Sequence, residues 1–396
     1  MRSLNRRRFL QLGSLTSGLA VPRVALGAAP PPAAEDRRVR LSGDGLGLTP
    51  LEYSALVHRL IEERGVTPDS YSLGGIVEQL EEECAHALGK ERAIFMPTGT
   101  LANHMAVRAL AGGASRVIVQ EQSHLYQDEG DCAQTLSSLT LMPLGPGRAT
   151  FTADEVQRLL DETKAARVVP RVSAISIETP VRRRQGQRFD PVELKKIIAI
   201  ARRDAIRLHL DGARLFLESA YSGDDVAEYC KPFDTVYVSL YKGLEGVRGA
   251  ILAGDEDTVG HAGVWRQRLG GALPDAWPLA VAALIGLDEV LPRMAAFRDH
   301  AVALVKAIAA GGVATVVPEP PQTPLFHVLL PVDVTAATKA RDELIAEEGV
   351  QVFSYVRPAS VPNWCGFEIT VSENSMEFAP AEVASLIDEL VRRARR

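Results

Sequence analysis

The chain has 396 residues, of which 46% are hydrophobic and 24% are charged, so it can bury a large core and divide into two lobes. Its net charge of -6 gives no basic surface, which excludes nucleic acid as an expected partner. Its four cysteines are widely spaced and no histidine and carboxylate cluster has ligand spacing, so no metal site is predicted.

The amino terminus has the pattern of an export signal. Residues 5–11 read Asn-Arg-Arg-Arg-Phe-Leu-Gln, which resembles the twin-arginine motif, and a mildly apolar stretch follows. Pro22 and Arg23 make that stretch a poor membrane span. We expect a signal peptide at 1–29, a proline-rich linker at 30–40, and a periplasmic or secreted protein without stable membrane insertion. If the segment is only a basic tail, the protein is cytoplasmic.

After the linker, the hydrophobic pattern alternates between helices and strands, which predicts an α/β fold with a mostly parallel sheet flanked by helices. We expect a large domain at 41–292 and a smaller α+β domain at 293–396. The helices are expected at 51–64, 76–88, 101–110, 275–291, 294–310, 333–348 and 380–395, and the strands of the small domain at 325–330, 351–355 and 367–371.

A candidate anion site follows the first strand of the large domain. Residues 92–96 read as a buried strand, and Pro97-Thr-Gly-Thr100 then opens a helix. The free amides and positive dipole end of such a helix suit a phosphate, with the hydroxyls of Thr98 and Thr100 as further donors. Gly99 allows close approach of the backbone. The same pattern also fits an ordinary helix N-cap.

Three side chains after later strands suggest pyridoxal phosphate (PLP) chemistry. Asp211 follows a strand at 207–210, and Lys242 follows the next strand at 235–240. A carboxylate keeps the pyridine nitrogen of PLP protonated, and a lysine amine forms its Schiff base. His124 follows a strand at 117–120, where an imidazole can stack on the ring and transfer protons. Taken singly, each could be an ordinary structural or surface residue.

These segments together resemble the threonine aldolase and β-eliminating lyase family of fold-type I PLP enzymes. The similarity runs through residues 94–103, 121–124, 209–216, 242–244 and 265–271. It implies that Lys242 bears the cofactor and Asp211 pairs with its pyridine nitrogen, and that His124 stacks on the ring. It also implies that Gly99 and Thr100 hold the phosphate and that Arg214 touches the ring oxygen or the substrate carboxylate. Glu129 and Glu178 would support the site, and the protein would be a homodimer or homotetramer.

The departures from the family pattern fall on the substrate side. Gly43 stands where the family has a carboxylate-binding serine, and Val181 stands where it has a histidine that contacts the substrate hydroxyl. Residues 273–275 lack the family's phosphate-binding arginine, so Arg266 or Arg268 would have to replace it. Glu368 occupies the place of a carboxylate-binding arginine and would repel an α-carboxylate.

The resemblance implies a carbon-carbon lyase that cleaves a β-hydroxy-α-amino acid into glycine and an aldehyde. A base near His124 would take the hydroxyl proton, and Arg214, or less directly Arg182 or Arg357, would meet the substrate carboxylate. Two alternatives remain open at this point. One is another PLP-dependent lyase, racemase or aminotransferase acting on a modified amino acid, and the other is a non-catalytic binding protein that kept the fold.

Overall fold

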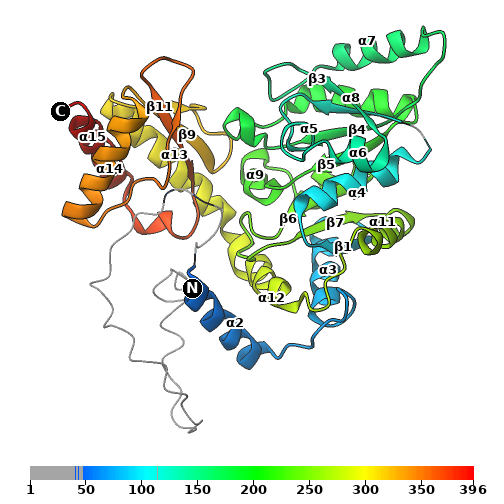
Figure 1. Cartoon of the computed structure of the whole chain (residues 1–396), viewed down its shortest axis with the longest axis horizontal. Helices are drawn as coiled ribbons and strands as arrows, with labels where there is room; N and C mark the ends of the chain where they lie inside the picture. The colour runs from blue at the N-terminus through cyan, green and yellow to red at the C-terminus, as the bar shows by residue number, and fades with distance from the viewer. Residues whose placement is uncertain (1–40, 42, 44–47, 114) are drawn as a thin grey trace. The chain divides into compact units, whose positions relative to one another are not determined.

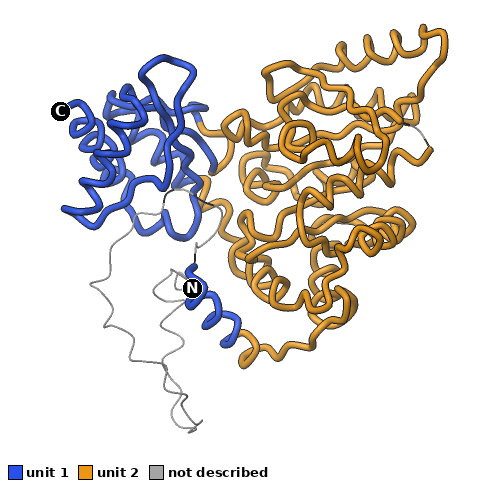
Figure 2. Tube along the Cα trace, viewed as in Figure 1, with its two compact units in different colours: residues 1–59, 299–320, 325–396 blue, residues 60–298, 321–324 orange. Residues whose placement is uncertain are grey.

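The structure is a computed structural model that describes residues 41, 43, 48–113 and 115–396. The expected signal peptide and linker lie outside the described residues. The described chain forms two compact units, one of residues 60–298 and 321–324, and one of the described residues up to Arg59 together with 299–320 and 325–396 (Figure 2). Each is described here by itself.

The larger unit is built on a seven-stranded sheet (Figure 1). Its spatial order is β1 (Arg92–Met96), β7 (Ala250–Gly254), β6 (Thr235–Ser239), β5 (Arg207–Asp211), β4 (Val172–Glu178), β2 (Arg116–Gln120) and β3 (Thr140–Leu144). Strands β2 to β6 are parallel, and β7 is antiparallel to both of its neighbours. Strands β1 and β6 therefore run in the same direction, so β1, β2, β4, β5 and β6 all end at one edge of the sheet.

The central strands are buried because helices cover the sheet. Every residue of β4, β6 and β7 is buried, as expected for a parallel sheet covered by helices on its faces. Helix α4 (Gly99–Ala111) packs against β5, β6 and β7. The remaining helical segments that lie wholly in this unit are α3 (Gly75–Ala87), α5 (His124–Gln127), α6 (Cys132–Ser137), α7 (Ala153–Lys164), η2 (Arg182–Arg184), α8 (Pro191–Arg203), α9 (Leu215–Ser222), α10 (Val226–Cys230), α11 (Glu256–Arg268), α12 (Trp277–Ile285), η3 (Gly286–Val290) and η4 (Leu291–Arg293).

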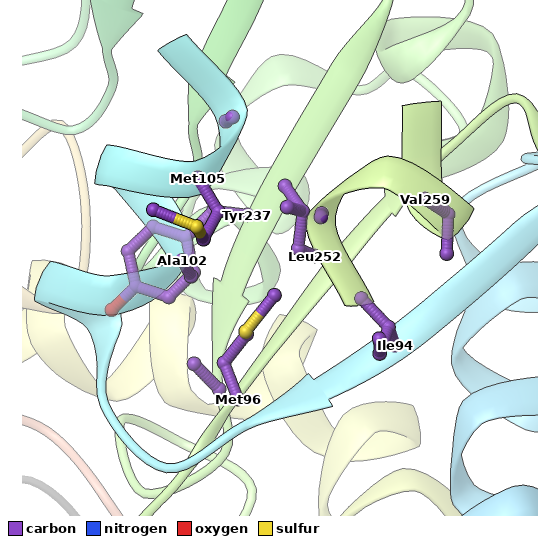
Figure 3. Close-up of a cluster of buried hydrophobic side chains, with 10 residues drawn as sticks. Ile94, Met96, Ala102, Met105, Tyr237, Leu252 and Val259 are labelled. Atoms are coloured by element: carbon purple, nitrogen blue, oxygen red, sulfur yellow. The ribbon is translucent and has the colours of Figure 1, made fainter. Parts of the chain in front are cut away.

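A hydrophobic cluster lies between α4, α11 and the sheet and fixes the position of α4. It joins Met96, Ala102, Met105 and Leu252 with the ring of Tyr237 (Figure 3). All five residues are at most 3% exposed. Burial of such side chains contributes about 1.5–3 kcal/mol each, so the start of α4 is held firmly against β6.

The smaller unit contains a four-stranded antiparallel sheet in the order β10 (Arg357–Pro358), β11 (Cys365–Thr370), β9 (Leu325–Leu330) and β8 (Thr315–Val317). Its sequence also contains α14 (Val334–Glu348) and α15 (Pro380–Ala394), while α2 (Pro50–Arg64) and α13 (Met294–Gly311) cross the division between the units. The expected α+β composition of this region is confirmed. No helix among the described residues is long and apolar enough to cross a membrane.

One local prediction was wrong and another was confirmed only in part. Residues 351–355 were expected to be a strand but form none, because Val352 and Phe353 fill the core by packing, with the Phe353 ring 4.9 Å from that of Phe367, rather than by pairing backbone groups. The helix expected at 275–291 begins at Trp277 and changes to π and 3₁₀ turns after Ile285.

Candidate active site

Three buried polar side chains lie side by side near the edge of the large sheet at which β4 and β5 end. Glu178 pairs in register with Asp211, and Asp211 pairs with Tyr237, across β4, β5 and β6. Each of the three is at most 5% exposed. Residues paired in register point to the same face of a sheet, so two carboxylates and a phenol share one surface at this edge.

Asp211 is a buried carboxylate whose hydrogen-bond donors are neutral. Its Oδ2 accepts a 2.8 Å hydrogen bond from Nδ2 of Asn103, and its Oδ1 accepts a 3.2 Å bond from the backbone N–H of Ala213. No ion pair to Asp211 occurs within the described part of the chain. Because a buried charge is costly unless it meets an opposite charge, this carboxylate suits a cationic ligand such as a protonated pyridine nitrogen.

Asn103 links Asp211 to a second buried carboxylate. Its Nδ2 lies 2.8 Å from Oε1 of Glu129 as well as 2.8 Å from Asp211. Its Oδ1 faces Nε2 of His209 at 3.0 Å, and Nδ1 of His209 lies 2.9 Å from the hydroxyl of Thr235. Burial lowers the pKa of His209 to about 4, so this ring stays neutral and holds the amide with both N–H groups toward the acids.

His124 meets the same network through Glu129. Its Nδ1 lies 2.9 Å from Oε1 of Glu129, whose side chain is fully buried, whereas the imidazole is 40% exposed. The hydrogen bond to Glu129 raises the pKa of His124, and burial raises the pKa of Glu129. The thiol of Cys132 donates to the other oxygen of Glu129 at 3.5 Å. The arrangement fixes one ring nitrogen and leaves the imidazole accessible.

Glu178 holds the segment that carries His124 by hydrogen bonds to the backbone. Its carboxylate accepts a 2.6 Å hydrogen bond from the backbone N–H of His124 and a 3.2 Å bond from that of Arg182. Burial, followed by the negative charge of Asp211, raises the pKa of Glu178 to about 7. Glu178 therefore acts on the site by holding two backbone segments together.

The start of α4 has the geometry of an anion-binding site, the anion cup, which is made of Thr98, Gly99 and Thr100. The hydroxyl of Thr98 caps the helix by accepting a 3.1 Å bond from the N–H of Leu101, and it can still donate its own hydrogen. The amides of Gly99 and Thr100 belong to the first turn, which lacks carbonyl partners within the helix. Nearby on β6, the buried hydroxyl of Ser239 has no partner within the described chain. Unused donors and a buried acid together fit a phosphorylated pyridine cofactor.

Lys242 and Arg214 lie close to this cluster. Lys242 follows β6 by three residues, and its charge opposes the rise in the pKa of His124 that the Glu129 hydrogen bond causes. Arg214 is 6% exposed at the start of α9, and its charge acts on Tyr237. The structure thus brings Asp211, His124, Lys242 and Arg214 into one neighbourhood.

Arg268 and Arg266 differ from these residues. The exposed guanidinium of Arg268 lies 4.7 Å from the ring centroid of Trp265, and it contacts none of the other candidates among the described residues. Arg266 is 3% exposed and donates to the carbonyl of Phe95 at 2.7 Å. Its charge is therefore used to hold β1.

The departures on the substrate side lie in a different environment. Val181 is fully buried and its backbone N–H donates to Gln187 at 2.8 Å, so no polar side chain reaches the site from this position. Beside it, Arg183 pairs with Asp128 at 2.9 Å on the surface. In the smaller unit, Glu368 faces His327 across β11 and β9 at 3.6 Å.

Sequence reasoning missed Asn103, His209 and Tyr237. Asn103 interrupts an apolar helix one turn after the anion cup, and Tyr237 is the one aromatic residue of β6. A polar residue at a position that a packed helix should fill with an apolar side chain is the available signal. His209 had none, because it reads simply as part of a strand.

Comparisons with known proteins give a family match and several related sequences. The chain matches the family described as beta-eliminating lyase over residues 65–330. The low-specificity L-threonine aldolase 1 of Arabidopsis thaliana is 30% identical over 224 residues, which cover 56% of this chain and 62% of that protein. The alanine racemase TOXG of Cochliobolus carbonum is 29% identical over 212 residues, or 53% of each protein. The matched stretches thus span less than two thirds of these curated relatives.

A solved structure covers more of the chain. A Listeria monocytogenes protein assigned as an L-allo-threonine aldolase superposes with a TM-score of 0.78 and 29% identity, over 91% of this chain and 96% of that one. This likeness and the sheet order confirm the expected α/β fold with a smaller α+β part.

Proposed function

Because the chain belongs to the beta-eliminating lyase family, we propose that it is a PLP-dependent carbon-carbon lyase of threonine aldolase type. It would cleave a β-hydroxy-α-amino acid into glycine and an aldehyde. The observation that carries the proposal is the buried Asp211, held by neutral donors beside the His124 and Glu129 pair. An acid for the pyridine nitrogen and an oriented base are two of the groups that this chemistry requires from the protein, beside the lysine that holds the cofactor.

Each residue would have a defined task. When bound, PLP supplies the electron sink for charge that develops at the substrate Cα. Lys242 would hold the cofactor covalently, Asp211 would hold its ring nitrogen, and the amides of Gly99 and Thr100 would hold its phosphate. Arg214 would meet the substrate carboxylate.

His124 would accept the proton of the substrate hydroxyl at Nε2. Its Nδ1 is tied to Glu129, which orients the ring and stabilises the imidazolium that forms. Val181 offers no group to read that hydroxyl. The contact therefore falls to His124, and weak discrimination between L-threonine and L-allo-threonine is expected.

The direct test is release of acetaldehyde and glycine from each of these two amino acids by the purified full chain. Both should be cleaved, and Lys242→Ala should abolish cleavage. A protein that binds PLP through Lys242 but releases acetaldehyde from neither substrate would contradict the aldolase proposal.

A racemase is the second candidate, because the alanine racemase TOXG shares 29% identity over 212 residues. Both reactions use the same cofactor and differ in which bond at Cα breaks. Incubation with L-alanine, followed by chiral analysis, separates them: D-alanine formation faster than threonine cleavage would favour the racemase.

We also propose export through the twin-arginine route, on the strength of Arg6 and Arg7 followed by an apolar stretch. Tracking a chain with both arginines changed to lysine tests it. Loss of export is expected, and unimpaired export would refute the proposal.

A further inference from the structure

We propose that the Tyr237 hydroxyl is an additional ligand of the cofactor phosphate and completes the anion cup at the start of α4. This inference rests on the proposed function for the presence of PLP. Tyr237 lies on β6, outside the turn of Thr98, Gly99 and Thr100, and the family resemblance does not assign it to the phosphate.

The position of the hydroxyl is set by packing. The Tyr237 ring lies in the apolar cluster of Met96, Ala102 and Met105, and its hydroxyl end points to the first turn of α4 (Figure 3). A Cβ atom added to Gly99 would overlap this hydroxyl. Gly99 is therefore required because the phenol oxygen lies directly against the first residue of the helix.

The Tyr237 hydroxyl makes no hydrogen bond within the described part of the chain. Most of the residue is buried, since it is 3% exposed, so its donor is held in one place by the packing of the ring. An unused donor placed against the amides of a helix N-terminus is suited to an anion.

Its protonation state also suits this task. Burial, followed by the negative charge of Asp211, raises the pKa of Tyr237 well above its ordinary value. The phenol therefore keeps its hydrogen at neutral pH. A neutral O–H donates to a phosphate dianion without bringing a competing negative charge.

A second hydroxyl on the same strand supports the placement of the phosphate on this side of β6. Ser239 lies two residues beyond Tyr237, so both side chains point to the same face of β6. Its buried hydroxyl likewise has no partner among the described residues. Two unused hydroxyls beside one helix start indicate a ligand with several acceptor oxygens.

The test compares PLP with pyridoxal, which lacks the phosphate, on the full chain freed of cofactor. Tyr237→Phe should weaken PLP binding by at least about tenfold, the effect of one hydrogen bond to a charged group. The affinity for pyridoxal should stay unchanged. Equal losses for the two ligands, or no loss for PLP, would overturn the proposal.

Stability supplies an independent readout. Without cofactor, Tyr237→Phe should unfold at the same temperature as the unchanged protein or higher, because the hydroxyl that it removes makes no hydrogen bond within the described part of the chain. A marked fall would reveal a structural partner for the hydroxyl and would refute the proposal. Tyr229→Phe is the matched control, since this half-buried phenol instead donates to Glu218 at 3.5 Å, and it should leave both ligand affinities unchanged.

The proposed function fails in a different way. If the unchanged protein shows no PLP absorbance that depends on Lys242, the cofactor assignment is wrong and the basis of the Tyr237 proposal is lost with it. If that absorbance is present and Tyr237→Phe changes the affinities for PLP and pyridoxal equally, the Tyr237 proposal alone is wrong.

Discussion

The hydrogen-bond network around Asp211 and the turn next to the substrate-side departures are embedded differently. Asp211, Asn103 and Glu129 are at most 6% exposed and share one hydrogen-bond network. The turn that follows Val181 lies at the surface, where Arg183 and Asp128 are 43% and 38% exposed. A change in the network leaves buried charges without partners, whereas a change in the turn is compensated by water. Substrate preference can therefore diverge while the cofactor chemistry is retained.

The largest effect should come from the network's central acid. Asp211→Asn keeps the shape of the side chain but removes the charge that would stabilise a protonated pyridine nitrogen. We expect kcat to fall by about a thousandfold, as for loss of a preorganised electrostatic contact. Asp224→Asn, the same change at an exposed position, should leave kcat unchanged. If both substitutions lowered kcat equally, the buried network would have no special part in the reaction.

Asn103→Leu should follow in size. It removes the donors of two buried carboxylates, so the free energy of unfolding should fall by about 2–5 kcal/mol, measured by chemical denaturation without cofactor. The comparable change on a surface, Gln79→Leu, loses only an exposed 2.8 Å bond to Glu83 and should cost less than about 1 kcal/mol. Equal costs would show that the network is not a stabilising unit.

The pH dependence of the reaction should report on Glu129. Its hydrogen bond raises the pKa of His124, and the base must be neutral to accept a proton. Activity should therefore fall as the pH falls through that pKa. Glu129→Gln removes the charge, so the acidic limb of kcat/KM should move to lower pH by about one unit. A limb that stays in place would show that another group is the base.

The smallest effect is expected on the substrate side. Arg183→Ala breaks a surface ion pair and should change the free energy of unfolding by less than about 1 kcal/mol. It should leave PLP affinity unchanged while it alters KM, because the turn is tied to the His124 segment. A loss of PLP affinity larger than the change in KM would contradict the separation of the two regions.

The sequence was sufficient to place residues that end strands. Asp211, His124 and Lys242 each follow an apolar run, and parallel strands bring their ends together. The hydrophobic periodicity and the order of the strands along the chain were therefore enough to place them. Asn103 and Tyr237 lie within elements, and their roles depend on which helix packs over which strand. That packing cannot be read from local pattern. The strand expected at 351–355 failed for a related reason, since alternating apolar residues also fit a loop that packs into a core.

The most direct measurement is the absorbance spectrum of the full chain with PLP, recorded with and without L-threonine, for the unchanged protein and for Lys242→Ala. We expect a visible cofactor band that changes when the amino acid is added and that Lys242→Ala lacks. A band that is the same in both proteins, or that no β-hydroxy amino acid alters, would contradict the assignment of this site as a PLP-dependent lyase centre.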